Sequence, residues 1–200
     1  MMMPLIAASQ GSFYTKNGYL ELEGILSPEE CDTFFAFMAN RDIWRQHPTL
    51  KTFILSRRMA GLALYLSGKP SLRLACDQWF PPGFSLDKPT KFKDLFSVQG
   101  ITSIILIQLQ PGTVTKPAKI SPLGLFPFPQ KQGSALIVTP DLLINWPPHP
   151  SIGLYAIAYS IPAAVYIQNP RDPSGLALKQ FGYGYGDLLK NDTHPLITSK

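Results

Sequence analysis

Histidine offers the most versatile chemistry in this sequence, because imidazole binds metals and titrates near neutral pH. The chain has three histidines, His47, His149 and His194, and a proline directly follows each of them. None begins an HxD or HxE motif, in which two side chains two positions apart on a strand point to the same side. The two cysteines, Cys31 and Cys76, lack CxxC spacing and lie in apolar surroundings. We interpret them as buried free thiols in a reducing compartment.

Other catalytic motifs are absent from the sequence, which has no GxSxG, no HExxH and no glycine-rich phosphate loop. The local patterns instead predict structure. The segment Phe13–Gly24 ends in the alternation of apolar and charged residues that is typical of a half-buried strand. Ser27 as N-cap, Pro28 in the first turn and Glu30 in capping-box spacing predict a helix start. A second helix is predicted over Leu50–Leu66.

Beyond residue 70, short apolar runs separated by proline and glycine predict strands. The four runs are Leu72–Phe80, Ile101–Leu109, Ser134–Thr139 and Ile152–Ile161. Pro111–Gly133 is predicted to be a long exposed loop, and Gly182–Gly186 a flexible or aromatic-packed turn. Helices first and strands afterwards favour an α+β chain that ends in a sandwich or barrel.

Composition limits the class of protein. The chain has 200 residues, of which 45% are hydrophobic and 16% are charged, so we expect one domain over residues 1–200. The net charge is +5, but the cations form no dense run with interleaved aromatics, and we expect no nucleic-acid partner. The first ten residues lack the pattern of a signal peptide, and no apolar run is long enough to span a bilayer. We therefore predict a cytoplasmic protein without a membrane segment; its oligomeric state stays open.

Three segments resemble the phytanoyl-CoA dioxygenase-like family of non-heme Fe(II)/2-oxoglutarate enzymes. Asn17–Leu20 leading into Leu26–Asp32 is similar to the opening strand and helix of that family. Asp77–Gly83 resembles the strand and turn before its metal motif, and Gln132–Leu143 followed by Pro147–Ser151 resembles its late strand and turn. The resemblance implies a double-stranded β-helix, a jelly-roll or cupin-like β-sandwich flanked by N-terminal helices. The chain is similar to a degenerate bacterial member that lacks the metal motif.

The resemblance also identifies what is missing. The family holds ferrous iron with two histidines and one carboxylate, yet no histidine lies between Pro81 and Gln110, where its HxD motif belongs. The place of the distal histidine falls on Ile144 or Asn145, with His149 several residues later. From Gln132 to Pro170 there is no lysine or arginine to bind the cosubstrate carboxylate. The resemblance thus implies no catalytic residue, no metal ligand and no cofactor.

Seven residues are candidates to line what remains of the pocket: Asp77, Gln78, Trp79, Asn145, His149, Tyr155 and Tyr159. His149 is the one we would expect to survive as a metal ligand, although its flanking prolines are typical of a turn. The aromatic members also suit an ordinary core, because β-sheet cores are rich in aromatic residues.

Three hypotheses about function follow. The leading one is a non-catalytic or repurposed member of the fold that binds a small apolar molecule or a protein partner. The first alternative is a divergent non-heme iron oxygenase with an unusual ligand set that includes His149. The second alternative, suggested only by the positive charge, is a metal-responsive DNA-binding regulator.

Overall fold

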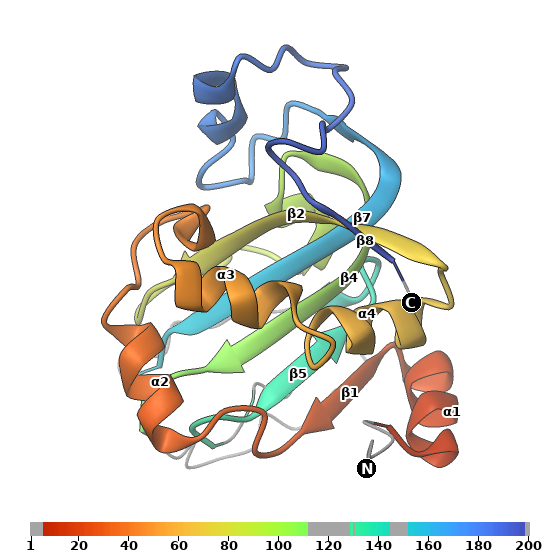
Figure 1. The fold of residues 1–200 in the computed structure, drawn as a ribbon, viewed down its shortest axis with the longest axis vertical. Coiled ribbons are helices and arrows are strands. Elements are labelled where there is room, and N and C mark those ends of the chain that lie inside the picture. Colours follow the sequence, from red (N-terminus) through yellow and green to blue (C-terminus); the bar gives the residue numbers. More distant parts are fainter. Residues whose placement is uncertain (1–5, 112–128, 130, 145–151, 199–200) are drawn as a thin grey trace.

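The computed structural model describes residues 6–111, 129, 131–144 and 152–198, and its centre is a six-stranded antiparallel sheet, here called the main sheet (Figure 1). Its strands follow the order β1-β5-β4-β7-β2-β8. Their bounds are Tyr19–Leu22 for β1, Ala135–Val138 for β5, Val98–Gln108 for β4, Leu154–Tyr166 for β7, Ser71–Phe80 for β2 and Leu196–Thr198 for β8. A second sheet pairs β3 (Thr90–Lys91) with β6 (Leu143–Ile144).

The four strands predicted beyond residue 70 are confirmed as β2, β4, β5 and β7. Only β7 differs much, because it continues past Pro162 to Tyr166. The pairing of β7 with β4 shifts register in this region, where Gly100 has a φ of 100°. A proline is tolerated in a strand at such an irregularity, since it cannot donate to the ladder of hydrogen bonds.

The main sheet has two buried faces, because successive side chains of a strand point to opposite sides. The helix face packs against the N-terminal helices and includes Ile105, Ile107, Ile137, Tyr155, Ile157 and Tyr159. The inner face includes Ile104, Leu106, Leu136, Val138, Ala156 and Ala158. It packs against Ile144 of β6 and against Phe92 and Leu95 of the 3-10 helix η2 (Phe92–Leu95).

Four α-helices precede most of the sheet: α1 (Ala8–Asn17), α2 (Pro28–Phe35), α3 (Pro48–Leu55) and α4 (Ala60–Ser67). Figure 1 shows α3 and α4 lying across one face of the sheet, with α1 beside the β1 edge. The capping box of α2 is confirmed. Ser27 Oγ accepts a hydrogen bond from the Glu30 amide at 3.2 Å, and the Ser27 amide donates to Glu30 Oε2 at 2.8 Å.

The prediction of one helix over Leu50–Leu66 is wrong, because the chain breaks between α3 and α4 at Ser56. Ser56 has an extended backbone with ψ of 158°, and its hydroxyl donates to the Phe53 carbonyl at 2.6 Å and accepts from the Met59 amide at 3.3 Å. A serine side chain that bonds nearby backbone groups competes with helix continuation. The start of the first predicted segment, Phe13–Asn17, is likewise helical and belongs to α1.

The C-terminal strap, residues 167–195, connects β7 to β8 and contains the 3-10 helix η3 (Ala177–Phe181). The predicted aromatic-packed turn at Gly182–Gly186 is confirmed, since the ring of Tyr185 lies 4.9 Å from that of Tyr166. Most of the predicted loop at Pro111–Gly133 lies outside the described residues. Among the helices that the structure describes, none has the length and apolar character needed to cross a bilayer.

Candidate functional site

The inner face of the main sheet is filled with apolar side chains. Those that are at most 2% exposed include Phe80, Phe92, Phe96, Ile104, Leu106, Leu136, Val138, Ile144, Leu154, Ala156 and Ala158. A side chain that lines a water-sized cavity keeps some accessible surface, so these side chains pack against one another at interior density. In the described residues, this face is therefore core and not a chamber for a ligand.

Few polar groups lie on the inner face. Burial raises the pKa of the Cys76 thiol to about 12, so it stays protonated at neutral pH. Gln78 donates from Nε2 to the carbonyl of Asn40 at 2.8 Å, and Gln108 donates from Nε2 to the carbonyl of Gln110 at 3.1 Å. Ferrous iron in such folds needs two imidazoles and a carboxylate. Nowhere in the described ranges do three His, Cys, Asp or Glu side chains gather to hold a metal, so these residues do not fit iron.

The histidines lie away from the inner face, as far as the structure describes them. His47 precedes α3 and stacks on Phe37, with ring centroids 4.1 Å apart. His194 is buried in the C-terminal strap, where its Nδ1 lies 3.2 Å from the hydroxyl of Tyr183. Of the predicted pocket residues, Asn145 and His149 lie outside the described residues.

Three other predicted pocket residues lie together on the helix face. Asp77 is fully buried on β2, and its Oδ2 accepts hydrogen bonds from the Tyr155 hydroxyl and, at 3.0 Å, from the Trp44 amide. Burial raises the pKa of Asp77 to about 7. The hydroxyl of Tyr159 donates to the carbonyl of Ile54 in α3 at 2.7 Å. These contacts attach Trp44 and α3 to the sheet beneath the helix layer.

The remaining two predicted residues, Gln78 and Trp79, lie near the end of β2 and point to opposite faces of the main sheet. Trp79 is half-buried and packs edge-on against Phe35 of α2, with ring centroids 5.8 Å apart. A Cβ added to Gly153 would come within 2.4 Å of the Trp79 ring, so glycine is required beside it. The structure thus brings Asp77, Tyr155 and Tyr159 together, but under the helices.

Sequence reasoning missed a buried ion pair between Arg41 and Asp172. Arg41 Nη1 lies 2.6 Å from Asp172 Oδ2, and the two side chains are 3% and 0% exposed. The carboxylate also accepts from the amides of Ser97 and Ser174. The guanidinium lies 5.8 Å from the ring centroid of Phe96, an inner-face residue. No local signal could have paired residues that lie 131 positions apart.

A second cluster of charge surrounds His194. Its Nε2 lies 3.5 Å from Nη2 of Arg45, and its carbonyl accepts a hydrogen bond from Nη1 of Arg73. Burial and then the Arg45 and Arg73 cations lower the pKa of His194 to about 3, so the imidazole is neutral. Both clusters connect the C-terminal strap to the segment between α2 and α3, and the second also connects it to β2. This is a structural role.

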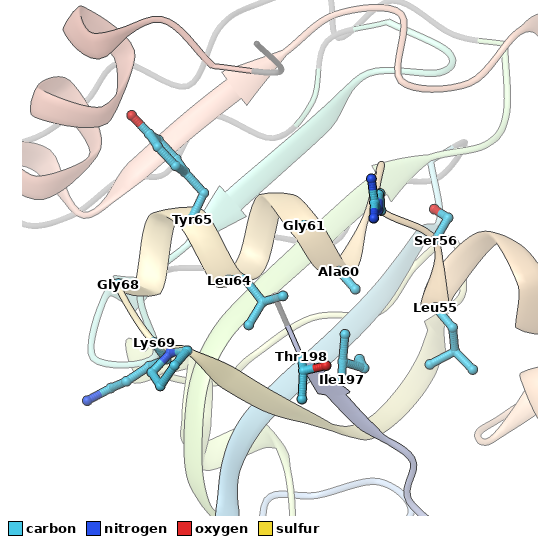
Figure 2. Close-up of a pocket in the computed structure, with 12 residues that line it drawn as sticks. Leu55, Ser56, Ala60, Gly61, Leu64, Tyr65, Gly68, Lys69, Ile197 and Thr198 are labelled. Carbon is cyan, nitrogen blue, oxygen red and sulfur yellow. The ribbon is translucent and has the colours of Figure 1, made fainter. Parts of the chain in front are cut away.

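The helix layer carries an open groove between α4 and β8, here called the α4–β8 groove (Figure 2). Its volume is about 660 Å³. Its lining residues are Leu55, Ser56, Arg57, Ala60, Gly61, Leu64, Tyr65, Gly68, Lys69, Pro70, Ile197 and Thr198. Figure 2 shows Leu64 of α4 pointing toward Ile197 and Thr198 of β8. Sequence reasoning did not find this groove, because it joins residues 55–70 to residues 197–198, which are far apart in the sequence.

The comparisons with known proteins identify the fold. No family model matches the chain, and no curated protein matches it either. Among solved structures, the non-heme alpha ketoglutarate dependent carbocyclase SnoK from nogalamycin biosynthesis superposes with a TM-score of 0.73 at 16% identity, over 96% of this chain and 97% of that chain. The epimerase SnoN from the same biosynthesis gives 0.69 at 16% identity, over 94% and 96%.

A third similar structure is EvdO2 from Micromonospora carbonacea var. aurantiaca, complexed with 2-oxoglutarate. Its TM-score is 0.59 at 12% identity, over 83% of this chain and 96% of that chain. These likenesses confirm the predicted α+β class and the double-stranded β-helix fold. They leave the finer assignment to the phytanoyl-CoA dioxygenase-like family, and the loss of its site, as predictions.

Proposed function

We propose that this chain is a non-catalytic binding protein, which uses the fold of 2-oxoglutarate-dependent enzymes and holds a small apolar molecule. One observation carries the proposal: apolar side chains fill the inner face of the main sheet, where Phe92, Phe96 and Leu106 are fully buried. Oxygenation on iron needs a polar, open coordination site with room for cosubstrate and oxygen.

The cations near this face support the same interpretation. Arg41 reaches the inner face beside Phe96, and Asp172 already neutralises its charge. A guanidinium that binds a buried carboxylate of its own chain does not serve a cosubstrate carboxylate, because the ion pair would have to break in a medium of low dielectric constant. Binding of a ligand by this protein then takes place outside the packed interior.

The test is an anaerobic titration of the purified protein with ferrous iron, followed by an assay of 2-oxoglutarate decarboxylation. We expect no stoichiometric iron binding and no iron-dependent turnover. Turnover that exceeds the iron-only blank would overturn the proposal.

The matched variant is His149→Ala, which removes the histidine that the sequence points to as the most plausible ligand. If the wild type shows iron-dependent 2-oxoglutarate decarboxylation and His149→Ala does not, the chain is a divergent oxygenase. If neither the wild type nor His149→Ala gives decarboxylation above the iron-only blank, the binding-protein proposal stands.

A further inference from the structure

The α4–β8 groove owes its shape to one stripe of α4. Gly61, Leu64, Tyr65 and Gly68 line the groove and follow the spacing i, i+3, i+4, i+7, which marks one side of a helix. The intervening Leu62 and Ala63 are buried in the core shared with the main sheet. Glycines at both ends of the stripe leave space that larger side chains would fill. The floor of the groove is thus shared with the core, since Ala60 and Leu64 belong to both, whereas Tyr65 and Gly68 are exposed at its rim.

The chemistry of the lining combines an apolar floor with positive charge. Leu55, Ala60, Leu64 and Ile197 supply apolar surface. Arg57 precedes α4 and Lys69 follows it, so a cation is present near each end of the helix. Asp and Glu do not occur among the residues that line this groove in the described structure. The exposed ammonium of Lys69 therefore favours an anion at that end of the groove, in keeping with the net charge of +5 of the chain.

We infer that the α4–β8 groove binds an anionic amphiphile, a molecule with one alkyl chain and a carboxylate head group. This inference rests on the proposed function and refines its ligand from an apolar molecule to an apolar chain that carries one charged head group. The volume of about 660 Å³ lies in the range of small-molecule sites. The eight residues of α4 span about 12 Å, which suits a medium-length alkyl chain lying along the helix. The apolar floor covers the chain, and Lys69 at the C-terminal end of α4 attracts the head group.

Gly61 offers a direct way to close the groove. A Cβ built on this residue meets only the Cβ of Arg57, at 3.9 Å, which is an ordinary contact. Leucine also favours helix over glycine by about 0.8 kcal/mol, so Gly61→Leu is expected to fold at least as stably as the wild type. The side chain then occupies the space of the alkyl chain.

The experiment is calorimetric titration of the full chain, without iron or 2-oxoglutarate, with decanoate below its micelle concentration. We expect saturable binding to the wild type and a loss of about tenfold or more in affinity in Gly61→Leu, since the leucine side chain keeps the alkyl chain from burying its apolar surface in the groove. Thermal melting of both proteins shows that the variant is folded. Equal affinity of wild type and Gly61→Leu, or no saturable binding to the wild type, overturns the inference.

Head-group selectivity is tested with decyltrimethylammonium, which has the same chain and the opposite charge. We expect it to bind about fivefold more weakly than decanoate, because attraction to Lys69 becomes repulsion. The variant Lys69→Gln should bind both molecules alike. The control Lys88→Gln removes the same kind of charge from an exposed residue outside the groove and should keep the preference for decanoate. A preference that persists in Lys69→Gln overturns the role of Lys69.

Different results would contradict the proposed function and the inference about the α4–β8 groove. Absent iron-dependent turnover together with absent decanoate binding overturns the groove inference alone. Iron-dependent turnover overturns the proposed function, whatever the groove binds.

Discussion

The two faces of the main sheet are equally buried but differ in chemistry. The inner face is apolar where it meets Phe92 and Phe96, whereas the helix face holds a carboxyl group and two phenols at Asp77, Tyr155 and Tyr159. The most strongly perturbed carboxyl of this sheet thus lies where the helices attach, and not in the interior between the sheets. A shifted pKa is often taken to indicate an active site, but ion pairs and buried hydrogen bonds shift pKa values as well. What separates an active site from a structural contact here is access to the carboxyl group, and not the size of its pKa shift.

The largest effect is expected at the margin of the inner face, from Arg41→Met. The change leaves the Asp172 carboxylate buried without its cation, although the amides of Ser97 and Ser174 still donate to it. Breaking a buried pair in this way costs about 3–5 kcal/mol of unfolding free energy. Urea denaturation measures it. A cost near zero would mean that the pair is solvated and that the inner face is open at this point.

A matched pair of truncations compares the two faces directly. Ile105 and Leu106 are neighbours on β4, both fully buried, and point to opposite faces. We expect Ile105→Ala and Leu106→Ala each to cost about 2–5 kcal/mol, since both remove well-packed core methyl groups. Urea denaturation of both variants gives the comparison. If Leu106→Ala costs much less than Ile105→Ala, the inner face is a chamber and the binding-protein proposal weakens.

The helix face should show a pH dependence of its own through Asp77. Burial raises the pKa of Asp77 from 3.8 to about 7, so the folded state binds more protons than the unfolded state between these values. The contribution of Asp77 is fully present below pH 3.8 and is lost as the pH rises through about 7. Asp77→Asn should remove this loss, which denaturation at a series of pH values measures. An unchanged pH profile would show that Asp77 is ionised in the folded protein.

His194 should change the free energy of unfolding with pH in the opposite direction to Asp77. Its effect should be the smaller one over the pH range in which denaturation can be measured. Its pKa is lowered from 6.5 to about 3, so the unfolded state binds the extra proton. Stability from this group is present above pH 6.5 and is lost as the pH falls toward 3. His194→Gln should flatten the acid side of the profile, measured by the same denaturation series. Between about pH 4 and 6.5 the contributions of Asp77 and His194 to stability change in opposite directions, so the wild-type profile alone does not separate them. Each variant therefore serves as the control for the other.

Local signals predicted much of the fold. Ser27 and Glu30 bond within one turn, so their spacing was enough to place the start of α2. The strands were predicted from apolar runs bounded by proline and glycine. The break at Ser56 was missed, because it depends on the two hydrogen bonds that the Ser56 hydroxyl makes with nearby backbone groups, and these leave no sequence pattern.

The candidate site was less predictable for a physical reason. The alternation along β7 places Tyr155 and Tyr159 on one face, but which face is covered by helices depends on contacts with distant segments. Asp77 and Tyr155 are 78 positions apart, and the α4–β8 groove joins residues 55–70 to residues 197–198. Such pairings are set by the topology of the sheet and have no sequence pattern of their own.

The interruption at Ser56 has a consequence for how this protein can change. By separating α3 from α4, it creates a corner on the outside of the helix layer, and Ser56 itself lines the groove there. Exposed positions of that corner, such as Tyr65 and Lys69, can be exchanged without repacking the sheet, whereas Ala60 and Leu64 belong to both the groove and the core. Selection can therefore alter the rim of the groove while the stability of the fold stays constant.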